Sequence, residues 1–147
     1  MNLAAADTSG LPLYLFASQL IAVGSICRTS PSVLPLCFLV GHITLDACLK
    51  RLGMWELFDN VWSCDDFNTT KADPQIYVLA AKRLNRSVEE VLFLDDNLNA
   101  DLTAKAAGMQ VCGVYDESSK DYVEQMKAAT DYYIYDFSQL PQLECFQ

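Results

Sequence analysis

Short apolar runs alternate with helical patterns along the chain from Ile43 onward. Strands joined by helices pair in parallel, because each helix carries the chain back to the edge at which the previous strand began. The alternation therefore predicts an α/β fold with a three-layer α/β/α, Rossmann-like parallel sheet. The runs with the length and composition of buried strands are Val91–Leu94, Val111–Tyr115 and Tyr132–Tyr135. The stretches with helical spacing between them are Leu98–Ala107 and Tyr122–Ala129.

The same alternation extends toward the N-terminus. A helix over Asp46–Leu52 is expected to end at Gly53, because glycine favours the position after a helix. Val61–Cys64 has the apolar pattern of a short strand. Asp73 and Pro74 then open a further helix as its N-cap and first residue. The apolar face of that helix follows helical spacing at Tyr77, Ala80, Ala81 and Leu84.

An acidic pair, Asp95 and Asp96, directly follows the predicted strand Val91–Leu94. The carboxyl ends of parallel strands face the crevice in which open α/β sheets bind their ligands. Two adjacent carboxylates repel each other unless a cation or a shared proton lies between them. Mg²⁺ is typically held by one or two carboxylates together with a substrate phosphate. The pair therefore predicts a Mg²⁺ site, with a surface turn, or Asp96 as a cap of the next helix, as the alternatives.

Length, charge and cysteine content narrow the class of protein. At 147 residues the chain can bury a substantial core. Its net charge of −9 argues against binding nucleic acid or an anionic membrane. The six cysteines contain no C-x-x-C pair, and there is one histidine, a pattern typical of neither a zinc site nor a disulfide framework. We therefore expect reduced thiols and a cytoplasmic protein.

An uncharged stretch, Thr8–Cys27, lies near the N-terminus and is long enough to span a membrane. No basic cluster flanks it, and the preceding residues lack the positive charge of a signal peptide. Polar residues and chain breakers also interrupt it, at Pro12, Ser18, Gln19, Gly24 and Ser25. These features favour a buried helix or strand, with a membrane-anchored domain as the alternative.

Four segments together resemble the C-terminal half of haloacid dehalogenase superfamily hydrolases, in the phosphatase and phosphoglucomutase branch. They are Ala47–Asp59, Lys71–Tyr77, Leu92–Asp101 and Ala104–Met109, and the likeness covers residues 43–140. The resemblance implies a hydrolase that forms an aspartyl-phosphate and acts on a small phosphorylated metabolite with Mg²⁺ as cofactor.

The resemblance also implies roles for individual residues. Lys71 corresponds to the catalytic lysine that binds the substrate phosphate, and Asp95 and Asp96 correspond to the metal-binding acids. Asp101 corresponds to an accessory acid of the metal site, and Thr44 is a candidate phosphate-binding hydroxyl. Lys71 as a solvated loop residue and Asp101 as an acid favoured by the helix dipole are the alternatives.

The nucleophile motif of the family is missing from this sequence. The family carries D-x-D on its first strand, and no D-x-D occurs in these 147 residues; Asp7–Gly10 has serine in place of the second aspartate. We therefore divide the chain into an atypical apolar segment, 1–42, and a core like that of the family, 43–147, without a cap domain. The segment is either a replacement for the missing central strand, with Leu20–Val23 as the candidate, or an unrelated piece.

These observations together favour a phosphatase by resemblance that is inactive or truncated as it stands. The alternative is a non-catalytic fragment that binds metal, phosphate or a partner chain. The sequence predicts neither the oligomeric state nor the particular substrate.

Overall fold

A computed structural model describes residues 22–25, 50, 51, 53, 55 and 60–146 of the chain. Its strands form one sheet in the order β1-β2-β3-β4. Strands β2, β3 and β4 run parallel to one another, and β1 pairs with β2 in the antiparallel direction. The bounds of the strands are Ala22–Ser25 for β1, Val91–Asp95 for β2, Gln110–Val114 for β3 and Tyr132–Ile134 for β4.

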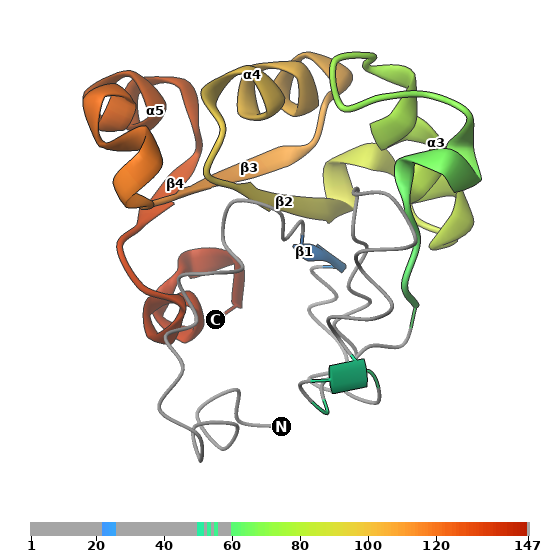
Figure 1. The fold of residues 1–147 in the computed structure, drawn as a ribbon, viewed down its shortest axis with the longest axis horizontal. Coiled ribbons are helices and arrows are strands. Elements are labelled where there is room, and N and C mark those ends of the chain that lie inside the picture. Colours follow the sequence, from blue (N-terminus) through green and yellow to red (C-terminus); the bar gives the residue numbers. More distant parts are fainter. Residues whose placement is uncertain (1–21, 26–49, 52, 54, 56–59, 147) are drawn as a thin grey trace.

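Figure 1 shows helices α3, α4 and α5 on one side of this sheet and the C-terminal turns on the other. Helices α4 and α5 are the crossovers that join β2 to β3 and β3 to β4, so the predicted α/β, Rossmann-like fold is confirmed. The helices are α3 (Gln75–Arg83), α4 (Leu98–Ala107) and α5 (Val123–Ala129). The 3₁₀ turns are η3 (Cys64–Phe67), η4 (Val88–Glu90), η5 (Glu117–Tyr122), η6 (Phe137–Gln142) and η7 (Glu144–Phe146).

The helix ends follow local signals in the sequence. Helix α4 has the predicted bounds, because the Asn97 side chain accepts hydrogen bonds from two amides of its first turn and Gly108 ends it at a φ of 100°. Helix α3 begins one residue later than predicted, although the Asp73 carboxylate still accepts a bond from the Gln75 amide, at 2.9 Å. Gly53 has a φ of 65°, as expected of a residue that ends a helix.

The predicted strand at Val61–Cys64 is wrong. Ser63 instead begins the 3₁₀ turn η3 through a capping box, in which its hydroxyl accepts from the Asp65 amide and the Asp66 carboxylate accepts from the Ser63 amide, at 2.7 Å. The apolar side chains of this region pack on each other, with the rings of Trp62 and Phe67 5.9 Å apart and nearly perpendicular. The S-x-x-D spacing of a capping box was the signal that favoured a turn.

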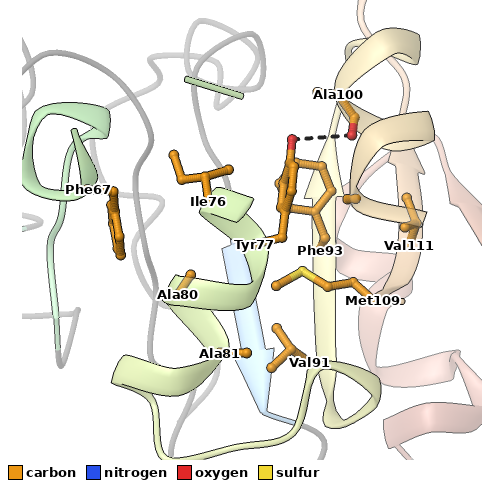
Figure 2. Packing of buried hydrophobic residues seen from close by; sticks show 11 residues of the cluster. Phe67, Ile76, Tyr77, Ala80, Ala81, Val91, Phe93, Ala100, Met109 and Val111 are labelled. Atoms are coloured by element: carbon orange, nitrogen blue, oxygen red, sulfur yellow. Dashed lines mark hydrogen bonds between the residues drawn. The ribbon is translucent and has the colours of Figure 1, made fainter. Parts of the chain in front are cut away.

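One hydrophobic cluster lies between the α-helices and the sheet (Figure 2). At its centre the rings of Tyr77 and Phe93 meet edge to face at 5.0 Å. The Tyr77 hydroxyl lies 2.9 Å from the carbonyl oxygen of Lys71 and 3.3 Å from that of Ala100, so it links the chain ahead of α3 to α4. The buried members are Phe67, Ile76, Tyr77, Ala80, Ala81, Val91, Phe93, Ala100, Ala104, Met109 and Val111.

A second cluster covers the opposite face of the sheet. Because side chains alternate along a strand, Leu92 and Leu94 of β2 join this cluster while Val91 and Phe93 join the first. Burial on both faces is typical of parallel strands and explains their nearly continuous apolar runs. The buried members are Leu92, Leu94, Cys112, Val114, Ile134 and Leu140.

Several predictions fall on residues outside the described ones. These are the candidate hydroxyl Thr44, the helix over Asp46–Leu52 apart from Lys50 and Arg51, and the uncharged stretch Thr8–Cys27 apart from β1. No helix among the described residues has the length and apolar character needed to cross a membrane.

The bonds of the Tyr77 hydroxyl predict a measurable contribution to stability. Replacing Tyr77 by phenylalanine keeps the ring but removes the donor that the carbonyl oxygens of Lys71 and Ala100 share, so we expect the free energy of unfolding in urea to fall by about 1–2 kcal/mol. Tyr122→Phe, at a side chain that is 51% exposed, is the matched control and should change stability by less than about 0.5 kcal/mol. Equal stability of Tyr77→Phe and wild type would show that the hydroxyl does not link these elements.

Candidate functional site

Three buried carboxylates lie where β2 ends and α4 begins. Asp95 is the last residue of β2 and Asp96 follows it, while Asp101 lies in the first turn of α4. Their exposed fractions are 1% for Asp95, 4% for Asp96 and 1% for Asp101. This is the carboxyl edge of the parallel sheet, where open α/β folds bind ligands.

Lys71 reaches this cluster from the chain ahead of α3. Its ammonium lies 2.9 Å from Oδ2 of Asp95, and its side chain is 23% exposed. The Tyr77 hydroxyl holds the Lys71 carbonyl oxygen, so the first turn of α3 positions the lysine backbone beside β2. Lys71 is therefore an ion-pair partner of a buried acid and not a solvated loop residue.

Asp95 and Asp96 face different surroundings. The second oxygen of Asp95 accepts a hydrogen bond from the Asn97 amide at 2.9 Å, so both of its oxygens are satisfied. Oδ1 of Asp96 is buried and has no hydrogen-bond partner. Because Asn97 caps α4, Asp96 is not the helix cap, and its burial also argues against a surface turn.

The favourable interaction of Asp101 with the helix dipole is too weak to explain why this side chain is buried. Both of its carboxylate oxygens lack a hydrogen-bond partner. An acid near a helix N-terminus gains about 0.3–1 kcal/mol from the dipole, whereas burying an unpaired carboxylate costs several kcal/mol. The dipole alone therefore does not account for the burial of Asp101, whose carboxyl oxygens are left without a partner.

Asp96 and Asp101 have raised pKa values. Burial, reinforced by the charge of Asp95, raises the pKa of Asp96 to about 7. Burial together with the charges of Asp95 and Asp96 raises the pKa of Asp101 to about 8, with Lys71 acting in the opposite direction. When all are ionised, three carboxylates face a single ammonium, which leaves two negative charges uncompensated.

A divalent cation fits this charge and these donor atoms. Carboxylate oxygens are hard ligands of the kind Mg²⁺ binds, and one such ion would neutralise the two excess charges. The described residues nevertheless contain no cluster of three or more His, Cys, Asp or Glu side chains arranged to hold a metal ion. The protein would therefore supply only part of the coordination of an ion bound here.

Tyr77 is the residue that the sequence did not single out for the site. Its place on the apolar face of α3 predicted a core residue. Its second role is to bind the Lys71 carbonyl oxygen. The only sequence signal for that role is the six-residue spacing from Lys71, which can be interpreted only once the turn ahead of α3 is known.

Comparisons with known proteins bear on the family and the fold of this chain. Residues 41–108 match the family model of haloacid dehalogenase-like hydrolases. A haloacid dehalogenase-like protein of Agrobacterium tumefaciens shares the fold with a TM-score of 0.66 at 23% identity, over 78% of this chain and 53% of that protein. At that identity the structural likeness carries the fold alone.

Two relatives align with a shorter part of the chain. The protein YhcW of Bacillus subtilis is 39% identical over 62 residues, which are 42% of this chain and 28% of the relative. The phosphorylated carbohydrates phosphatase of Thermotoga maritima is 36% identical over 62 residues, 42% of this chain and 29% of the relative. This chain thus aligns with less than a third of either relative. The likeness to the haloacid dehalogenase-like hydrolases is carried by residues 41–108, slightly less than half of this chain.

Proposed function

We propose that Lys71, Asp95, Asp96 and Asp101 form the metal and phosphate half of a phosphoryl-transfer site. The observation that carries the proposal is the set of buried carboxylate oxygens on Asp96 and Asp101 that have no hydrogen-bond partner. A protein keeps such groups where a ligand completes them. The ligands proposed are Mg²⁺ and the phosphate of a small phosphorylated metabolite, a class that includes the phosphorylated carbohydrates named for the Thermotoga maritima relative.

Each residue has a distinct task in this proposal. The Lys71 ammonium, still partly exposed beside Asp95, offsets the charge of the substrate phosphate. Asp95 and Asp96 offer oxygens to Mg²⁺, and Asp101 orients them or a metal-bound water. The ion, when bound, would screen the phosphate charge from an attacking carboxylate.

The attacking carboxylate is the part that this chain does not offer. The family resemblance requires an aspartate at the carboxyl end of a strand beside β2, and no D-x-D occurs in the 147 residues. Strand β1 occupies a place beside β2 but runs in the opposite direction, with Ser25 paired to Val91 at the start of β2. The carboxyl end of β1 therefore lies at the edge of the sheet away from Asp95.

We therefore propose that residues 1–42 form a substitute segment whose β1 takes the place of the nucleophile strand, ahead of a hydrolase core at 43–147. By itself the chain should bind Mg²⁺ and phosphate without turnover. This second function, a non-catalytic metal- and phosphate-binding domain, is favoured over phosphatase activity by the antiparallel direction of β1.

Mg²⁺ binding should stabilise the fold. At a concentration tenfold above its dissociation constant, Mg²⁺ should raise the free energy of unfolding by about 1.4 kcal/mol, which thermal unfolding in MgCl₂ and in NaCl of equal ionic strength measures. Asp96→Asn should lose this increment because it removes a ligand charge, whereas Asp121→Asn, at an exposed acid, should keep it. An equal Mg²⁺ effect in both variants would contradict the assignment.

Catalytic turnover should be absent. We expect no Mg²⁺-dependent hydrolysis of p-nitrophenyl phosphate above the buffer rate, because the chain lacks the aspartate that would form the aspartyl-phosphate. Hydrolysis that disappears in Asp7→Ala would reverse this expectation and identify Asp7 as the nucleophile.

Without metal, the raised pKa values of Asp96 and Asp101 predict a fold that weakens as pH rises. Both values, about 7 and about 8, exceed the ordinary 3.8, so the folded state binds more protons than the unfolded state between about pH 4 and 8. The free energy of unfolding in EDTA should therefore fall from pH 5 to pH 8, by at least about 1.4 kcal/mol, the equivalent of one pKa unit. Asp101→Asn should flatten this slope, and an unchanged slope would contradict the burial of an ionisable Asp101.

A further inference from the structure

On one face of the sheet, a position without a side chain lies between Asp95 and β4. In the strand register Asp95 pairs with Gly113, and Gly113 pairs with Tyr133. All three positions point to the α-helical face, because Phe93 and Val111, two residues before Asp95 and Gly113, belong to the first cluster, and Ile134, next to Tyr133, belongs to the second. The middle position of this row carries no side chain.

The Tyr133 ring occupies the space above Gly113. A Cβ atom added to Gly113 would lie 2.8 Å from Cδ2 and 3.2 Å from Cε2 of that ring. The ring therefore extends over β3, toward the strand that carries Asp95. A side chain at position 113 would close this path, which is the physical reason for a glycine inside a buried strand.

The Tyr133 hydroxyl is buried and has no hydrogen-bond partner, as is true of both oxygens of Asp101. Helix α4, which carries Asp101, packs on β2 and β3 over the same face of the sheet. Burial is the main cause that raises the pKa of Tyr133 to about 12, and the charge of Asp101 contributes to the rise. The phenol thus stays protonated near neutral pH and is a donor, while an ionised Asp101 is an acceptor.

Packing alone does not explain the hydroxyl. The Tyr133 ring meets the Tyr135 ring edge to face at 5.4 Å, a contact that phenylalanine would make equally well. A buried hydroxyl without a partner costs about 1–3 kcal/mol, so its presence points to a partner within the site.

We propose that Tyr133 is a positioning residue of the carboxylate site: when a divalent cation is bound, its hydroxyl, which has no partner in this structure, donates a hydrogen bond over Gly113 to Asp101, directly or through one water. This inference rests on the proposed Mg²⁺ site and extends it to β4. The bond fixes the orientation of the Asp101 side chain beside the cation.

Mg²⁺ alone is the probe for this inference, titrated into the full chain and followed by tyrosine absorbance and by thermal unfolding. Tyr133→Phe should weaken Mg²⁺ binding about three- to tenfold, the equilibrium factor of one hydrogen bond, and should abolish the Mg²⁺-induced change in tyrosine absorbance. The matched control is Tyr132→Phe, at a neighbouring side chain that packs on the second cluster, and it should retain both. Gly113→Ala, which displaces the ring but keeps the hydroxyl, should weaken binding as well.

The outcomes separate this inference from the proposed function. Mg²⁺ binding and an absorbance change that are the same in Tyr133→Phe and wild type would overturn the role of Tyr133 and leave the metal site standing. Absence of Mg²⁺ binding in the wild type would overturn both. Should Tyr133→Phe fail to fold by circular dichroism, Gly113→Ala decides, and wild-type affinity in that variant would refute the inference.

Discussion

The ion pair between Lys71 and Asp95 joins the chain ahead of α3 to the end of β2. The Tyr77 hydroxyl adds to this link by binding the Lys71 carbonyl oxygen. Asp95 can be buried because one of its oxygens meets this ammonium and the other meets a backbone amide. Asp96 and Asp101 have no comparable partner, so the cluster carries an excess of negative charge whenever both acids are ionised. Stability and ligand affinity are opposed here, as is common in functional sites.

Local signals in the sequence predicted the elements whose ends are fixed by neighbouring residues. Helix α4 could be placed because its cap at Asn97 and its end at Gly108 are both short-range features. The strand expected at Val61–Cys64 failed because apolar residues at a turn resemble a strand, and the capping box of Ser63 outweighed them. The direction of β1 could not be predicted, since an apolar run of four residues contains no information about the strand with which it pairs.

Some residues of the candidate site could likewise be predicted from local sequence, and others could not. Asp95 and Asp96 could be predicted because they follow an apolar run directly, and Lys71 because its motif lies just ahead of a recognisable helix start. Asp101 is buried because of the face that α4 turns to the sheet, which the sequence does not specify. The Tyr133 ring can lie over β3 because a different strand has a glycine there. Such relations arise between elements distant in sequence, so no local pattern contains them. The roles of these residues remain predictions from resemblance and charge.

The pairing of residue 22 with residue 94 has a consequence for the order of folding. Strands β2, β3 and β4 are connected by short helices and can associate while few residues separate them, whereas β1 must close a long loop to reach β2. During synthesis β1 leaves the ribosome well before its partner exists. In that interval β1 is without its partner, and until it docks, the edge of β2 that β1 covers has unpaired backbone groups, which is the condition under which strands of different chains associate. The timing of this one contact thus sets how long that edge of β2 is open to pairing with another chain.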